Sequence, residues 1–152
     1  MTVIRPVEAR DVVVWAAMRN RLWPDADMLE LSNETVAFIT DPTSSWLDAA
    51  FIAESPEGKA LGFIELTIRA FSDGCDSMPV PHIEGWFVNE SSRQNGVGTA
   101  LLTAAEAWCR EHDFTELASD TEFSNVASQH AHERLGFEEV GRLVKFRKLL
   151  DG

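Results

Sequence analysis

The sequence contains no tyrosine, only two cysteines, and 13 lysine and arginine residues against 25 aspartate and glutamate residues. The two thiols, Cys75 and Cys109, are too few for a disulfide framework, which suggests a reducing compartment and a fold held together by its own core. The formal net charge of −12 disfavours nucleic acid and anionic lipid as partners, because both attract clustered lysine and arginine. An acidic surface of this kind would instead attract a polycation, although composition alone fits a soluble acidic protein equally well.

Long apolar runs are also missing. No stretch approaches the roughly 20 residues that a membrane-spanning helix requires, and the first residues lack the apolar core of a signal peptide. We therefore expect a cytoplasmic protein. The chain has 152 residues, of which 45% are hydrophobic and 25% charged. This length and composition predict one packed domain that spans residues 1–152.

Hydrophobic periodicity predicts helices and strands in alternation. Helical spacing is found over residues 8–22, 29–40, 99–112 and 125–135. Strand patterns cover residues 3–5, 51–54, 60–71, 83–88 and 116–119, with one or two further strands in 138–150. Since the two kinds of element alternate along the chain, we expect an α/β fold with a mixed sheet.

A glycine-containing loop joins the strongest strand pattern to the strongest helix pattern. Its sequence is Arg93-Gln94-Asn95-Gly96-Val97-Gly98. The two glycines permit a tight turn with exposed N–H groups, and the positive end of the next helix favours a phosphate. The loop lacks the Gly-Lys-Ser/Thr of a Walker loop and the third glycine of a dinucleotide fingerprint. By itself, it would also serve as a purely structural cap.

Two motifs together resemble the GNAT superfamily of N-acetyltransferases. Arg93-x-x-Gly96-x-Gly98 is similar to the family's Arg/Gln-x-x-Gly-x-Gly/Ala signature, which lies between a strand and a helix. Asn125 begins a helix that ends in the triplet 135–137, Leu-Gly-Phe, a second family element. The match runs over about residues 50–148. The resemblance implies a mostly antiparallel mixed sheet flanked by about four helices, acetyl-coenzyme A as co-substrate, and no metal.

The resemblance also implies which residues contact the co-substrate. The loop amides would bind the pyrophosphate of coenzyme A. Strand 83–88 would pair with the pantetheine arm, at the place where strand 116–119 splays away from it. The expected contact residues are Trp86, Phe87, Val88, Arg93, Gln94, Asn95, Gly96, Val97, Gly98, Thr99 and Asn125.

Acetyl transfer to an amine requires removal of a proton and stabilisation of an oxyanion. Glu84, directly before Gly85, is expected to act as the base. In relatives a glutamate on this strand often does so through a water molecule. The alternative for Glu84 is a structural or substrate-clamping role. A glycine inside a strand often marks a bulge, which would direct a backbone N–H towards the oxyanion. Asp120 would help Glu84 accept protons. His132 stands where the family often has a tyrosine acid, and it would donate a proton to the departing thiolate or only hydrogen-bond the sulfur. A thiol with a pKa of about 8.5 can also leave without an acid.

A closer resemblance is to the aminoglycoside 6′-N-acetyltransferases, especially a short group whose members are dimers. It rests on residues 18–25, 81–85, 117–120 and 125–132. A polycationic acceptor would bind carboxylates and an aromatic face. Each candidate also has a structural explanation: Trp23 could pack in the core, Asp120 could cap a helix, and the loop aspartates Asp73 and Asp76 could simply be solvated. The expected acceptor-binding residues are Trp23, Asp25, Asp73, Asp76, Glu84, Asp120 and Glu122.

Two alternatives to this function stay open. One is a GNAT enzyme for another cationic amine, such as a polyamine or a protein amino terminus. The other is a catalytically silent domain that binds acyl-coenzyme A and a partner protein. The resemblance further implies a homodimer, with residues 138–150 as the expected contact.

Overall fold

A four-stranded antiparallel sheet forms the centre of the fold in a computed structural model that describes residues 1–151. Each strand pairs with the one before it in the chain. The last strand begins three residues earlier than the sequence pattern predicts. The strands are β1 (Val3–Pro6), β2 (Ala49–Glu54), β3 (Ala60–Arg69) and β4 (Val80–Val88).

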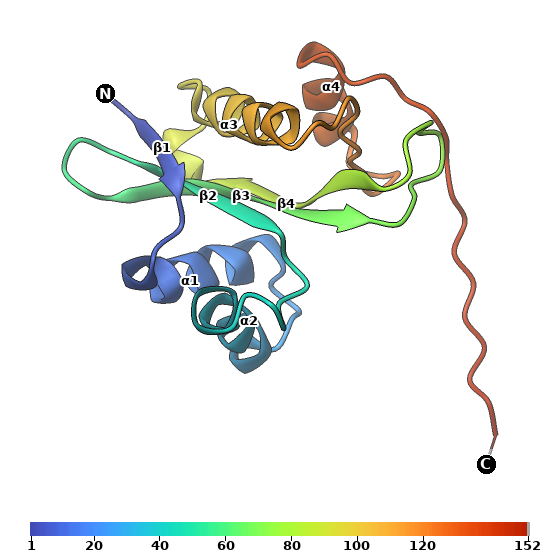
Figure 1. The fold of residues 1–152 in the computed structure, drawn as a ribbon, viewed down its shortest axis with the longest axis horizontal. Coiled ribbons are helices and arrows are strands. Elements are labelled where there is room, and N and C mark those ends of the chain that lie inside the picture. Colours follow the sequence, from blue (N-terminus) through green and yellow to red (C-terminus); the bar gives the residue numbers. More distant parts are fainter. Residues whose placement is uncertain (152) are drawn as a thin grey trace.

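Helices cover both faces of this sheet (Figure 1). One face carries α1 (Val12–Leu22) and α2 (Met28–Thr40), and the other carries α3 (Val97–Glu111) and α4 (Val126–Arg134). The four helices predicted from the sequence are confirmed, with ends that differ by a few residues, and the mixed α/β class is confirmed as well. Within residues 1–151, no helix combines the length and apolar character that crossing a membrane requires.

Alternation along β3 divides the apolar residues between two cores. Ile64 and Leu66 pack with Leu101 in the core under α3. Phe63 packs with Trp15 in the core under α1 and α2. Between Phe63 and Leu66, odd-numbered residues of β3 therefore face α1 and α2, and even-numbered ones face α3.

Strand β4 contains a bulge at Glu84. Leu66 of β3 pairs with Ile83 and Glu65 pairs with Gly85, so that Glu84 has no partner on β3. A Cβ atom on Gly85 would lie 2.9 Å from the Trp23 ring and 3.0 Å from Oε1 of Glu65. No larger residue fits there without a shift of its neighbours. The bulge that Gly85 led us to expect is therefore present.

The strand predicted at residues 116–119 is reduced to one isolated bridge. Ala118 accepts a hydrogen bond from the Ile83 amide at 2.9 Å and donates one to the Pro81 carbonyl at 2.9 Å, in a parallel arrangement. The bridge is centred on His82, just before the bulge in β4. Because the bulge bends β4, the two segments pair only briefly before it.

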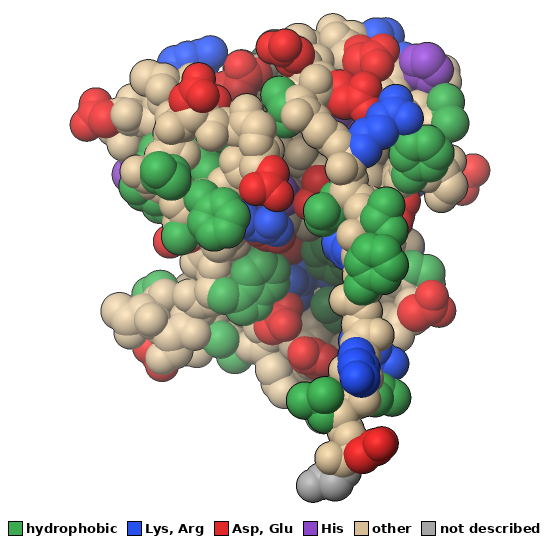
Figure 2. Space-filling view, turned by 90° about the vertical axis from the view of Figure 1, so that its right-hand side faces the viewer, with side chains coloured by type: hydrophobic (Ala, Val, Ile, Leu, Met, Phe, Trp, Pro, Cys, Tyr) green, Lys and Arg blue, Asp and Glu red, His purple; other side chains and the backbone are tan. Residues whose placement is uncertain are grey.

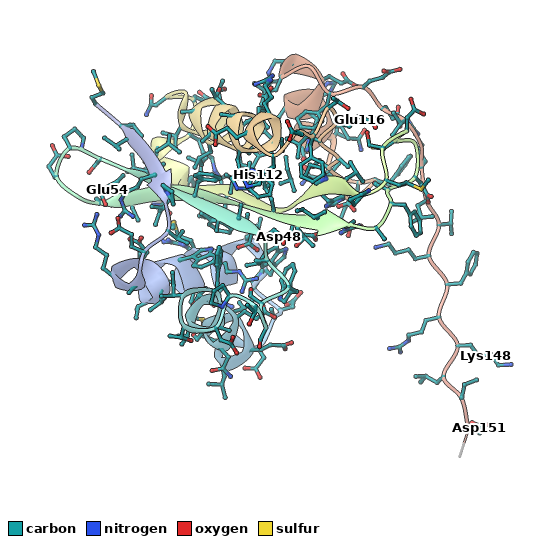
Figure 3. The ribbon with its side chains drawn as sticks, in the orientation of Figure 1. Asp48, Glu54, His112, Glu116, Lys148 and Asp151 are labelled. Atoms are coloured by element: carbon teal, nitrogen blue, oxygen red, sulfur yellow. The ribbon has the colours of Figure 1, made fainter. Side chains whose placement is uncertain are left out.

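The one or two strands predicted for residues 138–150 are wrong. The chain instead leaves the body after α4 and runs as an extended segment, here called the C-terminal arm (residues 138–151), which carries Lys148 and Asp151 far from the sheet (Figures 1 and 3). The sequence has strand-like apolar content, but a strand also requires a neighbour with which its backbone can pair. The arm's apolar side chains are each more than half exposed, namely Val140, Leu143, Val144, Phe146, Leu149 and Leu150.

Candidate active site

Four ionisable side chains meet beside the bulge; we call Arg69, His82, Glu84 and Asp120 the acid–base cluster. Arg69 donates two hydrogen bonds to Glu84, from Nε to Oε1 at 2.8 Å and from Nη2 to Oε2 at 3.0 Å. His82 lies between the two carboxylates, with Nδ1 3.4 Å from Oε1 of Glu84 and Nε2 3.4 Å from Oδ2 of Asp120. His82 is 2% exposed, whereas Asp120 reaches solvent.

Each group of the acid–base cluster shifts the pKa of its neighbours. Burial alone would raise the pKa of Glu84, but His82 and Arg69 outweigh it, so that the pKa lies below its usual value. The adjacent His82 likewise lowers the pKa of Asp120. Burial would lower the pKa of His82, but Asp120 and Glu84 raise it above its usual value. Both carboxylates are therefore ionised at neutral pH, and the imidazole binds a proton more tightly than either.

A buried ion pair lies beneath the bulge. Arg19 and Glu65 are 1% and 0% exposed, and Nε of Arg19 lies 3.2 Å from Oε2 of Glu65. The indole of Trp15 also donates to Oε2 of Glu65 at 3.1 Å, and the Arg19 guanidinium lies 5.2 Å from the centre of the Trp23 ring. Because Glu65, Trp23 and Phe63 pack directly against Gly85, the buried pair supports the backbone at the bulge.

The glycine-containing loop leaves the start of α3 open to an anion. Gln94 and Gly96 have positive φ angles of 66° and 79°. Gly96 is the N-cap of α3 and supplies no side-chain cap, whereas Asp27 caps α2 and Asn125 caps α4. The first amides of a helix have no acceptor within the helix, and a Cβ on Gly96 would meet nothing within 4 Å. The loop therefore fits a pyrophosphate.

Basic side chains lie next to this loop. A cavity of about 720 Å³ is lined by three basic side chains, Arg21, Lys59 and Arg93, around the ring of Phe87, and by one acidic side chain, Glu90. Nε of Arg93 donates to the Val88 carbonyl at 3.0 Å, and its guanidinium lies 5.8 Å from the centre of the Phe87 ring. In a chain of net charge −12, these cations make this region favourable for an anionic co-substrate.

Comparison with known proteins agrees with this geometry. Residues 14–137 match the acetyltransferase (GNAT) family. The chain is 45% identical to aminoglycoside N(6′)-acetyltransferase type 1 of Klebsiella aerogenes over 148 residues, which cover 97% of each chain. It is 38% identical to the protein of that name in Stenotrophomonas maltophilia, over 97% of this chain and 94% of the relative.

Solved structures are similar over the whole length. A structure of AAC(6′)-Iy in complex with the bisubstrate analogue CoA-S-monomethyl-acetylneamine has a TM-score of 0.88, at 35% identity and 99% coverage of both chains. The aminoglycoside 6′-N-acetyltransferase AAC(6′)-Ih of Acinetobacter baumannii has a TM-score of 0.86, at 31% identity, with 99% of this chain and 100% of that chain covered. The chain belongs to the GNAT acetyltransferase family. The resemblance drawn from its two motifs is confirmed, as is the fold it implied.

In this GNAT chain the predicted co-substrate residues have unequal surroundings. The Trp86 indole donates to the Gly98 carbonyl at 3.2 Å and so ties β4 to the loop. Val97 is buried in the core under α3, so its side chain serves packing. Phe87 is largely buried in the other core but also lines the cavity beside Arg93. Asn125 accepts a hydrogen bond from the Ser128 amide at 3.1 Å and caps α4. Asn95 and Thr99 are exposed.

His132 lies in a network that fixes its protonation pattern. Its Nδ1 is 2.7 Å from the Ser128 carbonyl, which can only accept, so that Nδ1 carries a hydrogen. In the neutral ring Nε2 then accepts from the Ser119 hydroxyl at 2.8 Å. The ring packs edge-to-face on Trp86 and Phe137. His132 would therefore donate a proton only in its charged form, and its role as acid stays a prediction.

The predicted acceptor-binding residues are brought together only in part. Glu84 and Asp120 meet through His82, and Trp23 lies against Gly85. Figure 2 shows a hollow beside the C-terminal arm with acidic and basic side chains inside it. The remaining predicted residues are exposed, and their part in binding stays a prediction; they are Asp25, Asp73, Asp76 and Glu122.

The loop before β4 is anchored by Glu116. Its carboxylate accepts hydrogen bonds from the Ser77 amide at 2.5 Å and the Asp76 amide at 3.2 Å. The pKa of Glu116 is lowered by these contacts, first by that with Ser77. The anchor holds the loop that carries Asp73 and Asp76 to the segment that leads into Asp120.

Sequence reasoning missed two members of the acid–base cluster. His82 stands two residues before Glu84 on one strand, and this spacing places both on the same face, so the signal was available. Arg69 reaches Glu84 only because of the register between β3 and β4, for which no local pattern exists. Within residues 1–151, no group of three histidine, cysteine or acidic side chains is arranged to hold a metal ion.

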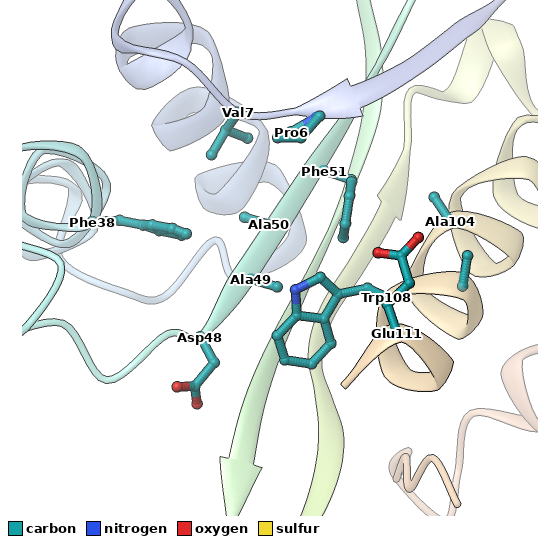
Figure 4. Close-up of a pocket in the computed structure, with 11 residues that line it drawn as sticks. Pro6, Val7, Phe38, Asp48, Ala49, Ala50, Phe51, Ala104, Trp108 and Glu111 are labelled. Carbon is teal, nitrogen blue, oxygen red and sulfur yellow. The ribbon is translucent and has the colours of Figure 1, made fainter. Parts of the chain in front are cut away.

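A further cavity of about 430 Å³ lies away from these residues, between α2, α3 and the start of β2 (Figure 4). Phe38, Phe51 and Trp108 line it, with the carboxylates of Asp48 and Glu111 at its rim. No predicted site residue is among the residues that line it. The predicted site residues therefore lie elsewhere, around the acid–base cluster and the loop at the start of α3.

Proposed function

We propose that this GNAT enzyme is an aminoglycoside 6′-N-acetyltransferase that moves the acetyl group of acetyl-coenzyme A to the 6′-amine of the antibiotic and thereby confers resistance. The acceptor class follows from similarity to enzymes of that name along 97% of the chain. The structural observation that supports it is Glu84, an ionised carboxylate held at an unpaired strand position beside Asp120. Such a pair of carboxylates attracts a polycationic acceptor.

In this reaction the residues divide the work between the two substrates. Acetyl-coenzyme A supplies an activated acetyl group. The open amides at the start of α3 and the nearby Arg93 hold the phosphates of the coenzyme. Glu84 attracts the acceptor ammonium and takes its proton, so that the neutral amine can attack. The bulge leaves backbone N–H groups near Gly85 outside the ladder, where one can stabilise the developing oxyanion.

Thiol release from acetyl-coenzyme A tests this function directly. The acceptors are kanamycin, tobramycin, amikacin, spermidine and a peptide with a free amino terminus. We expect saturable turnover on the aminoglycosides at micromolar concentrations, with the other two inert. Turnover only on spermidine or the peptide would replace the acceptor. Binding of acetyl-coenzyme A without turnover on any amine would instead identify a silent binding domain.

We also propose a cytoplasmic location and a single catalytic domain. Cys75 and Cys109 are both free thiols, as a reducing compartment favours. Burial raises the pKa of Cys109 to about 11, so that this thiol is unreactive. The two cores lie on opposite faces of one sheet, which supports one folding unit.

We propose that the enzyme is a homodimer in which a second copy covers each C-terminal arm. Phe146 and Leu150 are 92% and 85% exposed, and an extended apolar segment of this kind needs a partner surface. Residues 140–150 contain four basic residues and no acidic one, whereas the whole chain has a net charge of −12. The arm is therefore complementary in charge to the body of another copy.

Light scattering after size exclusion tests the dimer. We expect a dimer for the wild-type chain and a monomer for the double variant Leu143→Asp, Phe146→Asp, because two carboxylates would be buried without partners at the interface. Val13→Asp is the control, since Val13 is 78% exposed on α1 and lies outside the arm. A monomeric wild type would overturn the dimer, and a dimeric double variant would place the contact elsewhere.

A further inference from the structure

His82 is a buried titratable side chain for which the sequence predicted no role. It is 2% exposed on β4, and its Nδ1 is buried without a hydrogen-bond partner of good geometry. A buried polar atom left unpaired is costly, so its presence needs an explanation. The closest acceptor to Nδ1 is Oε1 of Glu84, at 3.4 Å.

The charged groups around His82 come from each element that surrounds it. Arg69 on β3 pairs with Glu84, Glu84 follows on β4, and Asp120 comes from the segment after the bridge at Ala118. Lys145 of the C-terminal arm also acts on Asp120 and lowers its pKa. His82 therefore connects a half-buried carboxylate, Glu84, to an exposed one, Asp120.

Glu84 needs such a connection if it removes a proton from an ammonium group. A carboxylate whose pKa is lowered keeps an acquired proton poorly. Arg69 occupies both of its oxygens with hydrogen bonds, which further disfavours the protonated form. The proton must therefore move on to a group with higher affinity, and the adjacent imidazole is that group.

We propose that His82 is a positioning residue of the acetyl transfer, which takes the proton that Glu84 removes from the acceptor and passes it through Asp120 to solvent. This inference rests on the proposed acetyltransferase function. The acceptor R–NH3⁺ and ionised Glu84 become R–NH2 and protonated Glu84. Protonated Glu84 returns to its carboxylate as Nδ1 of neutral His82 accepts the proton. Nε2–H of the imidazolium then gives its proton to Asp120, which releases it to water. Exchange of the remaining ring proton from Nδ1 to Nε2 restores the starting tautomer before the next turnover.

The relay requires neutral His82 at the start of each turnover, which sets the sign of its pH dependence. Asp120 and Glu84 raise the pKa of His82 above its usual value. We therefore expect kcat for an aminoglycoside to be high above that pKa and to fall as the pH drops through it. NMR titration of the histidine ring protons, assigned by comparison with His82→Gln, gives the pKa of His82 in the protein itself.

The first test compares His82→Gln with the wild type and with His130→Gln, a control on the exposed face of α4. Glutamine is polar but does not titrate. At a pH above the pKa of His82, kcat of His82→Gln should therefore be about 100-fold below that of the wild type, and it should no longer fall as the pH drops. His130→Gln should retain the kcat of the wild type and its fall at low pH. The relay would be overturned if kcat of His82→Gln still fell at low pH. It would also be overturned if kcat of the wild type fell at a pH that differs from the pKa measured by NMR.

A second test separates the relay from simple loss of structure. His82→Ala leaves space for free imidazole, and we expect added imidazole to restore kcat at least tenfold while leaving the rate of His130→Gln unchanged. Absence of rescue in a variant that melts like the wild type would count against the relay. Both tests require that the wild type acetylates an amine. If the wild type turned over no amine, the proposed function would be wrong, whereas the pKa of His82 could still be measured by NMR.

Discussion

Replacing Glu84 with glutamine is expected to lower kcat/KM for an aminoglycoside about a thousandfold, because an amide oxygen of the same shape cannot take the proton of the acceptor. The substitution also leaves Arg69 without its carboxylate partner, and an unpaired cation repels a polycationic acceptor. Steady-state thiol release with kanamycin measures the change. The KM for acetyl-coenzyme A should stay the same, since the loop at the start of α3 is separate from the acid–base cluster.

Glu57→Gln is the matched control for this prediction. Glu57 is exposed in the turn between β2 and β3. Its substitution removes the same charge from the chain but leaves the acid–base cluster unchanged. Its kcat/KM should remain within about twofold of the wild type, as screening at physiological salt predicts for a distant surface charge. Unchanged kcat/KM in Glu84→Gln would show that another group removes the proton.

Replacing Arg19 with methionine is expected to destabilise the fold by about 3–5 kcal/mol, because Glu65 then stays buried as an uncompensated charge. Arg19 contacts Glu65 through Nε at 3.2 Å and also donates to the Leu31 carbonyl at 3.2 Å, so the substitution removes several partners at once. Urea unfolding at pH 8, followed by tryptophan fluorescence, measures the change in the free energy of unfolding.

The loss should be smaller at acid pH. Burial raises the pKa of folded Glu65 from 4.5 to about 7 in spite of Arg19. The folded protein therefore binds this proton more tightly than the unfolded chain, and the stability due to Glu65 falls as the pH rises from about 4.5 towards 7. Without Arg19 the pKa rises further, so that Arg19→Met should cost more at pH 8 than at pH 5.

Arg10→Met provides the comparison, because Arg10 forms ion pairs with Glu8 and Glu54 at the surface and is 59% exposed. Its loss should change the free energy of unfolding by less than about 1 kcal/mol at either pH. Equal losses for Arg19→Met at pH 5 and pH 8 would mean that Glu65 does not carry the charge that Arg19 balances.

The local patterns of the sequence predicted those features that neighbouring residues decide. Helical periodicity located α3, whose buried residues include Leu101 and Ala105. Gly85 within an apolar run predicted a bulge, and the register of β3 and β4 confirms it. The loop at residues 93–98 was recognised because positive φ angles and exposed amides need glycine at a defined position.

Features that depend on residues far apart in the chain could not be predicted from the sequence. The Arg69–Glu84 pair forms across a hairpin, and its register is a property of two strands together. Residues 116–119 and 138–150 have strand-like composition, but a strand forms only where another backbone runs alongside. The first of these segments meets β4 briefly at Ala118, and the second leaves the body of the protein. Composition does not contain that information.

The bulge in β4 places Glu84 outside the backbone pairing that holds this strand in the sheet. Among residues 80–88, Glu84 is the position without a partner on β3, and the residues on either side of it pair as in a regular hairpin. A chain that lacked this one residue could keep every backbone pair between the two strands. Glu84, which we propose as the base, is thus one extra residue in an otherwise regular strand. A substitution at this position therefore leaves the backbone pairs between the two strands in place.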